Sequence, residues 1–221
     1  MSPPVSDKST HAVTMGLSRL HHPVTVLGHG SRAGIWFQGC SLGCNGCVSR
    51  DTWPSATPEE QVPVAEVLEW LAACLPVDGL TISGGEPFDQ PEALAALIAG
   101  FRSIADPAHA DVLVYSGYSA KRLRSLHKTL FVQADAVITG PYLATSPGDS
   151  RRGSANQEVH AHTDIGRQRY VNGTGPAGGI QAITAGGQLW MIGIPRSGDM
   201  QRLEETLATR GVSLRDVSWR C

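Results

Sequence analysis

Hydrophobic positions along this chain recur with two different spacings, one typical of strands and the other of helices. Short apolar runs predict strands at residues 24–27, 34–38, 80–82, 111–115 and 134–139. Apolar residues three and four positions apart predict helices at residues 64–75, 91–101 and 120–127. Because strands and helices alternate with short links, the pattern predicts an α/β fold built on a parallel sheet or an open barrel.

The pattern weakens after Tyr142, where a polar, glycine-rich stretch follows. Two short apolar runs at residues 181–184 and 188–192 flank Gly186 and Gly187, which predicts a hairpin. A last helix is expected at residues 198–210.

The start of the chain has a different composition. Residues 1–22 are rich in Ser, Pro, Thr and His, and we expect them to form a flexible N-terminal extension. The 221 residues are enough for one substantial domain, which we expect over residues 23–221 with an appendage from about residue 180.

Charge and hydropathy exclude several classes of protein. The net charge is −2 with interspersed charges, which gives no electrostatic case for nucleic-acid or anionic-membrane partners. No apolar stretch approaches the roughly 20 residues that span a bilayer, and no secretory hydrophobic segment opens the chain. We therefore expect a soluble protein of the cytoplasm.

Three cysteines in one short loop, Cys40, Cys44 and Cys47, carry the clearest chemical signal. Three thiolates are one too few for a closed tetrahedral zinc site, but they suit a 4Fe–4S cluster with an open position on one iron. A glycine precedes each cysteine and provides the backbone freedom that wrapping a bulky cluster requires. Iron–thiolate bonds need reduced cysteines, which also favours a cytoplasmic location.

A zinc knuckle is the alternative, completed by Cys74, Cys221 or one of the eight histidines. No second Cys-x2-Cys or His-x3-His pair appears at zinc-finger spacing, so the cluster is favoured while zinc stays open. Cys74 lies on the apolar face of a predicted helix and Cys221 is the last residue, so we expect neither to be a ligand. A disulfide framework is not expected, because five cysteines is an odd number and the chain is not small.

Four motifs in this order resemble the radical S-adenosylmethionine superfamily, specifically its short activating-enzyme branch. They are the cysteine loop, Ser-Gly-Gly-Glu-Pro-Phe at 83–88, Tyr-Ser-Gly-Tyr at 115–118, and Gly-Pro-Tyr at 140–142 followed by Gly-Ser-Ala-Asn-Gln at 153–157. The nearest likeness is to anaerobic ribonucleotide reductase activating proteins, which are glycyl-radical activating enzymes with a single 4Fe–4S cluster. It covers roughly residues 24–160, and it includes Asn156 and Gln157 without indicating a role for them.

The resemblance implies a specific chemistry. Cys40, Cys44 and Cys47 would hold a 4Fe–4S cluster whose fourth iron is chelated by the amino and carboxylate groups of S-adenosylmethionine. An electron from the cluster would cleave the sulfonium bond, giving methionine and a 5′-deoxyadenosyl radical that abstracts a hydrogen atom from the substrate.

The resemblance also implies residues that bind S-adenosylmethionine. Gly84 and Gly85 would let the backbone approach the methionine amino group, with the Glu86 carboxylate nearby. Ser116 would reach the ribose or carboxylate of the cofactor, or it would merely turn the chain. Gly46 occupies the place where the family packs its backbone against the adenine.

For the fold we expect an incomplete, laterally open (β/α) barrel of mainly parallel strands over residues 24–140, with a small C-terminal hairpin and helix. An open side would admit a macromolecular substrate. The expected function is to generate a glycyl radical on a partner such as anaerobic ribonucleoside-triphosphate reductase, with flavodoxin or ferredoxin as electron donor. The alternatives are a radical enzyme that modifies a peptide or small metabolite, and a non-catalytic iron–sulfur or zinc protein. The Gly-Gly-Glu-Pro turn disfavours the last of these, because an electron carrier needs no nucleoside site.

Some residues depart from the family pattern. Residues 28–34 read Gly-His-Gly-Ser-Arg-Ala-Gly where the reductase activators usually resemble Asp-Gly-Pro-Gly-Val-Arg. Val48 and Ser49 replace an aromatic residue and Asn, and Thr139 stands where an acid is frequent. These departures affect the choice of partner rather than the cluster. His160 and His162 alternate, and we expect them to be solvated rather than to bind a metal.

Overall fold

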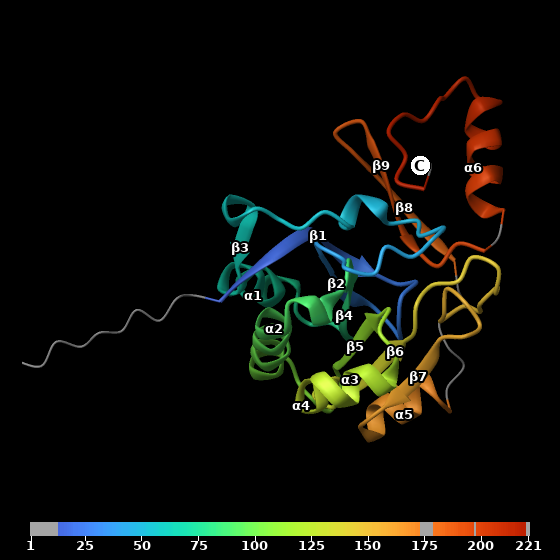
Figure 1. Ribbon diagram of the computed structural model, residues 1–221. Helices are drawn as coiled ribbons and strands as arrows, with labels where there is room; N and C mark the ends of the chain where they lie inside the picture. Colours follow the sequence, from blue (N-terminus) through green and yellow to red (C-terminus); the bar gives the residue numbers. More distant parts are fainter. Residues whose placement is uncertain (1–12, 173–178, 197, 220–221) are drawn as a thin grey trace, which may run out of the picture.

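Four parallel strands form the centre of the structure, a computed structural model that describes residues 13–172, 179–196 and 198–219 (Figure 1). They belong to a seven-stranded sheet with the order β3-β1-β2-β4-β5-β6-β7. Its strands are β1 (Thr14–Val24), β2 (Arg32–Phe37), β3 (Gln61–Pro63), β4 (Gly79–Gly84), β5 (Asp111–Ser116), β6 (Ala136–Thr139) and β7 (Glu158–Ala161). The pairings β2–β4, β4–β5 and β5–β6 are parallel. The pairings β1–β2, β1–β3 and β6–β7 are antiparallel.

This topology confirms the α/β class, while the incomplete barrel stays a prediction. Parallel pairing is confined to the centre, and antiparallel strands flank it on both sides, so the sheet is mixed and open. The predicted C-terminal hairpin is present as β8 (Ile180–Ala185) and β9 (Gln188–Gly193), and the predicted last helix as α6 (Asp199–Ala208). Positive φ angles at Gly186 and Gly187 suit the two-residue turn that joins the hairpin strands.

The first strand begins earlier than the sequence predicted. We expected a flexible extension over residues 1–22 and a strand at residues 24–27. Instead, β1 begins at Thr14, where it pairs with β3, and it pairs with β2 from Leu17 onwards. The strand was not recognised because it contains polar Ser, Arg and His residues in place of an apolar run. Only Met15, Gly16 and Val24 of this strand are buried. Residues 14–22 therefore belong to the sheet, and residues 1–12 lie outside the described part of the chain.

The helices are α1 (Val64–Cys74), α2 (Pro91–Ile104), α3 (Ala120–Leu126), α4 (Lys128–Phe131) and α5 (Asp164–Tyr170), with single turns η1 (Arg50–Thr52), η2 (Pro58–Glu60) and η3 (Pro87–Asp89). The first three were predicted from their apolar spacing. The sequence analysis missed α4, α5, β3 and β7, all of which are seven residues or shorter. Such short elements carry too few apolar positions for a period to be read.

The core fills both faces of the sheet. On one face, the strands pack against the apolar sides of α1 and α2, with Leu94, Leu97 and Phe101 fully buried. On the other face, Trp190 of β9 meets Trp36 of β2 edge to face, with 5.1 Å between ring centroids. Tyr170 of α5 packs there against β5 and β6. The appendage is thus anchored on the sheet by an aromatic contact.

A buried ion network joins the amino ends of the central strands. Arg32 at the start of β2 donates to both carboxylate oxygens of Asp111 at the start of β5, at 2.8 and 3.0 Å. The Tyr170 hydroxyl donates to the same carboxylate at 2.6 Å, and Arg169 pairs with it. Burial alone would raise the pKa of Asp111, but the Arg32 guanidinium together with the hydrogen bonds from Tyr170 and Arg169 outweighs burial and holds that pKa below its usual value.

Candidate functional site

The cysteine loop leaves the carboxyl end of β2, as the sequence predicted. Its base is fixed by backbone hydrogen bonds from Gly39 N to Thr52 O at 2.8 Å and from Cys40 N to Trp53 O at 3.0 Å. Within the loop, Cys47 N donates to Cys44 O at 3.1 Å. Residues 44–47 therefore form a closed turn, and Cys40, Cys44 and Cys47 all carry free thiols that are half-buried.

A cluster and a single metal ion require different spacings of their ligands. In the described part of the chain, no three His, Cys, Asp or Glu side chains form a group that could hold one metal ion. In a 4Fe–4S cluster each thiolate binds a different iron, so the ligands stand farther apart. Burial raises the pKa values of Cys40 and Cys47, and the positive charge of bound iron would reverse that effect.

Gly46 is required by its neighbours as well as by its backbone. Its φ is +77°, and a Cβ there would lie only 2.8 Å from the Cβ of Ala144. The segment after the Gly-Pro-Tyr motif therefore packs directly on the cysteine loop. Asn156 and Gln157, which had no role in the sequence analysis, hold this segment: their side chains donate to Pro141 O at 2.8 Å and to Gly140 O at 2.9 Å.

The Gly-Gly-Glu-Pro turn lies against the base of the cysteine loop. Gly85 N donates to Phe37 O at 2.8 Å, and Glu86 N donates to Gly39 O at 2.9 Å. A Cβ on Gly84 would clash with the backbone of Phe37, and one on Gly85 would clash with the carbonyl of Gly39. Both glycines are thus needed for close backbone approach, and the turn is joined directly to the loop that carries the cysteines.

Glu86 and Ser116 are brought together, and both are buried. Ser116 Oγ donates to Glu86 Oε1 at 2.9 Å, while Gly117 N donates to Oε2 at 2.7 Å and Phe88 N to Oε1 at 3.0 Å. Burial raises the pKa of Glu86 to about 7. In this arrangement the two side chains join the turns after β4 and β5.

A second hydrogen-bonded link between these turns and the cysteine loop was not predicted from the sequence. Asp89 accepts hydrogen bonds from Ser41 N at 2.8 Å and from the hydroxyls of Ser41 and Tyr118. The hydroxyl oxygens of Ser41 and Tyr118 also lie 2.8 Å apart, so either hydroxyl can donate to the other in place of Asp89. In the sequence, Asp89 could have indicated this link, because it closely follows the Gly-Gly-Glu-Pro motif. In the structure it ends the one-turn helix η3, which faces the loop.

Cys74 and the paired histidines lie elsewhere. Cys74 ends α1 and packs against the core of the sheet, while Cys221 lies outside the described residues. His160 of β7 and His162 after it both meet the ring of Phe131 edge to face. None of the three described residues lies in the cysteine loop.

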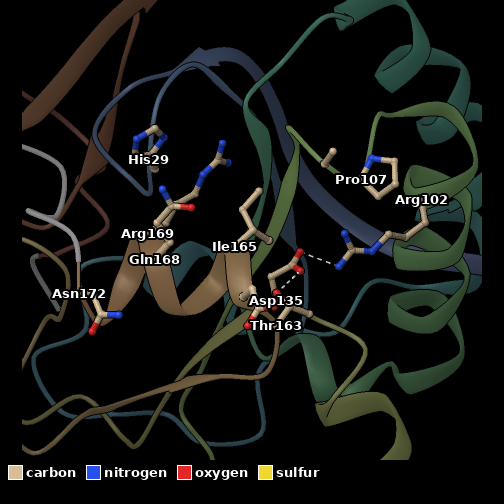
Figure 2. A pocket seen from close by; sticks show the side chains of 11 residues that line it. His29, Arg102, Pro107, Asp135, Thr163, Ile165, Gln168, Arg169 and Asn172 are labelled. Carbon is tan, nitrogen blue, oxygen red and sulfur yellow. Dashed lines mark hydrogen bonds and ion pairs between the residues drawn. The ribbon is translucent and has the colours of Figure 1, made fainter.

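Two cavities lie at opposite edges of the sheet. One of about 290 Å³ adjoins the cysteine loop and is lined by Cys40, Ser41, Asp89 and Gln90, among others. The larger, about 990 Å³, lies at the amino ends of the strands (Figure 2), where Asp135 pairs with Arg102 and accepts a hydrogen bond from Thr163. None of its lining residues belongs to the cysteine loop.

Comparison with known families shows which family the chain belongs to. Residues 26–160 match the model of a family described as "4Fe-4S single cluster domain". The chain belongs to this family. The match spans β2, β4, β5 and β6 and every motif around the cysteine loop.

Three bacterial relatives of this single-cluster protein are named anaerobic ribonucleoside-triphosphate reductase-activating proteins. The one from Vibrio cholerae is 26% identical over 149 residues, and the alignment covers 65% of this chain and 96% of the relative. The one from Pasteurella multocida is 27% identical over 152 residues, with the same coverage. The one from Escherichia coli K12 is 25% identical over 146 residues, covering 63% of this chain and 95% of the relative.

The family match ends before the C-terminal appendage of this single-cluster protein, which returns to the cysteine loop. Ser218 Oγ donates to the carbonyl of Val48, next to Cys47, at 2.6 Å. The indole of Trp219 donates to Glu204 of α6 at 2.6 Å. The appendage therefore contacts both the sheet, through Trp190, and the loop that carries the cysteines.

Proposed function

We propose that this protein is a radical S-adenosylmethionine enzyme that generates a glycyl radical on a partner such as anaerobic ribonucleoside-triphosphate reductase. The proposal rests on one observation: backbone hydrogen bonds join the Gly-Gly-Glu-Pro turn to the base of the three-cysteine loop. The names of relatives covered over almost their whole length support the choice of partner.

When bound, a 4Fe–4S cluster supplies the electron that reductively cleaves the sulfonium bond of S-adenosylmethionine. The protein's own contribution is to hold and orient. Cys40, Cys44 and Cys47 would provide the thiolates, leaving one coordination position for the cofactor. The fit is supported by three half-buried free thiols in one short loop.

We assign the cofactor-facing surface to Gly46, Gly84, Gly85, Glu86 and Ser116. The glycines present backbone groups without Cβ atoms, so the methionine part can approach closely. Glu86 and Ser116 act as a pair: their hydrogen bond fixes the turns after β4 and β5 in one arrangement. An already ordered surface loses less entropy when the cofactor binds.

The remaining parts of the proposal concern the fold, the setting and the reductant. We propose that the open sheet curves as an incomplete barrel around the site and belongs to a single domain. The protein would act in the cytoplasm, receive electrons from a flavodoxin or ferredoxin, and bind neither nucleic acid nor membrane. In the described part of the chain, no helix has the length and apolar character needed to cross a bilayer.

A second candidate is a radical enzyme that modifies a peptide or small metabolite. It is favoured by one observation, the C-terminal appendage that lies beyond the family match and touches Val48 beside the cysteines. Such an addition would narrow the access to the site and select a smaller substrate.

Anaerobic reconstitution followed by dithionite reduction tests these functions. We expect 5′-deoxyadenosine from S-adenosylmethionine, and a glycyl radical signal in electron paramagnetic resonance when an anaerobic ribonucleotide reductase is added. Cleavage without a radical on any reductase supports the second candidate. Absence of 5′-deoxyadenosine under strict anaerobiosis contradicts both and favours a non-catalytic iron–sulfur protein.

A further inference from the structure

The surface of α3 and α4 carries an unbalanced positive charge. Lys121, Arg122, Arg124 and Lys128 are all exposed. The sequence contains no Asp or Glu between Asp111 and Asp135, and the whole chain has a net charge of −2. This basic patch, defined by those four residues, is therefore a local feature against an acidic background.

The four side chains are not neutralised by ion pairs. Among the described residues, none of them lies within 4.0 Å of a carboxylate, whereas Arg167 of α5 and Arg202 of α6 each pair with an aspartate three residues away. Arg124 contacts only the ring of Phe131 and His160. A solvated surface of this kind is free to attract an acidic partner.

The basic patch adjoins the cysteine loop. The guanidinium of Arg122 lies 4.0 Å from the centre of the Tyr118 ring. The Tyr118 hydroxyl in turn lies 2.8 Å from Ser41 Oγ, and Ser41 follows Cys40 directly. Two side-chain contacts, from Arg122 to Tyr118 and from Tyr118 to Ser41, therefore connect the patch to the residue that follows the first cysteine.

We propose that the basic patch on α3 and α4 is the docking surface for an acidic one-electron donor protein. This inference rests on the proposed function, which consumes one electron for each S-adenosylmethionine cleaved. At the surface the donor loses one electron, which passes to the cluster, and no covalent bond forms or breaks. Charge complementarity selects an acidic donor, and the contacts of Arg122 place one end of the patch beside the cysteine loop.

Stopped-flow reduction of the reconstituted protein by a fully reduced flavodoxin tests the proposal. The double variant Lys121→Glu/Arg122→Glu is compared with the wild type at about 20 mM salt, following the visible absorbance of the cluster. We expect the second-order rate constant to fall by about tenfold or more, because like charges now face each other. The difference should shrink at about 0.5 M salt, where surface charges are screened.

Two single variants and a small reductant distinguish a loss of donor docking from a general loss of the cluster's ability to accept electrons. Arg167→Glu makes the same charge change as Arg122→Glu, but on α5, which lines the cavity at the amino ends of the strands. It should leave the rate close to the wild-type value. Arg122→Lys keeps the positive charge, so it should retain most of the wild-type rate constant. Dithionite at high salt should reduce all variants equally, because it needs no docking surface.

The proposal is wrong if the double variant accepts electrons from flavodoxin at the wild-type rate at low salt, or if Arg167→Glu slows transfer equally. It is also wrong if the patch variants lower only the glycyl radical yield with dithionite as reductant, since the patch would then bind the reductase. Cluster reduction is measured without S-adenosylmethionine, so a failure of cofactor cleavage would contradict the proposed function separately.

Discussion

The carboxylate of Glu86 accepts a hydrogen bond of 2.9 Å from the hydroxyl of Ser116 in the interior of the protein. One residue ends the turn after β4 and the other ends β5, so this bond joins two turns that are 30 residues apart in the sequence. Gly117 N and Phe88 N donate to the same carboxylate. Glu86 therefore organises the edge of the sheet beside the cysteine loop.

Replacing Glu86 by Ala should destabilise the cluster-free protein by about 3 kcal/mol, because three buried donors lose their acceptor. Ser116→Ala removes one donor and should cost only about 1 kcal/mol. Urea unfolding followed by circular dichroism measures both. Glu59→Ala, on the exposed turn η2, is the control and should leave the unfolding midpoint unchanged. Equal losses for Glu86→Ala and Ser116→Ala would contradict the central role of the carboxylate.

Glu86 should also make the stability of the cluster-free protein depend on pH. Burial raises the pKa of this carboxyl from its ordinary value of 4.5 to about 7. Between those values the folded state binds more protons than the unfolded state, so the free energy of unfolding falls as pH rises. The total loss is on the order of 3 kcal/mol by pH 8. Glu86→Gln cannot ionise, so the difference in stability between wild type and variant should shift in favour of the variant from pH 5 to pH 8. A difference independent of pH would show that Glu86 titrates normally.

The cysteines provide a direct test of the cluster. Cys40→Ala, Cys44→Ala and Cys47→Ala should each abolish the iron content and the brown colour after anaerobic reconstitution, while the wild type binds about four irons per chain. Cys74→Ala is the matched control, because Cys74 packs at the end of α1 outside the loop. Iron and sulfide analysis with electron paramagnetic resonance gives the readout. Stoichiometric zinc in place of iron would favour the zinc alternative.

Gly85 should be required for the cluster although it provides no ligand. An added Cβ would clash with the carbonyl oxygen of Gly39, which the neighbouring Glu86 N also needs as its acceptor. Gly85→Ala should therefore shift the base of the cysteine loop and reduce the iron bound on reconstitution severalfold. Gly186→Ala introduces strain at a positive φ in the hairpin with open space around it, so it should leave the iron content unchanged. Full iron loading of Gly85→Ala would contradict the close packing of turn and loop.

The central strands and the cysteine loop could be predicted from the sequence because each depends on residues that are close together along the chain. Apolar runs marked β2, β4, β5 and β6, and the spacing of three cysteines marked the loop. The role of Glu86 could not be predicted, because its partner Ser116 is distant in the sequence and the burial that raises its pKa comes only from the fold. Strand β1 was missed for a related reason. Its polar residues lie on a partly exposed antiparallel strand, where pairing with β2 matters more than apolar alternation.

The buried carboxylate of Asp111 should be the most sensitive acidic position at the amino edge of the sheet. Arg32 and Tyr170 both donate to it, and all three side chains are almost completely buried. Asp111→Asn leaves the Arg32 guanidinium buried without an anion, which should cost about 3–5 kcal/mol. Asp164→Asn breaks an exposed pair with Arg167 and should have no measurable effect.

The stability that Asp111 contributes should also depend on pH. The Arg32 guanidinium and the other donors hold the pKa of Asp111 below its usual value of 3.8, against the opposing effect of burial. The contribution of this carboxylate is therefore present above pH 4 and is lost on further acidification. Urea unfolding of the two variants and the wild type at pH 7 and pH 3 measures both effects. A small loss for Asp111→Asn at pH 7 would show that the network adds little to the stability of the sheet.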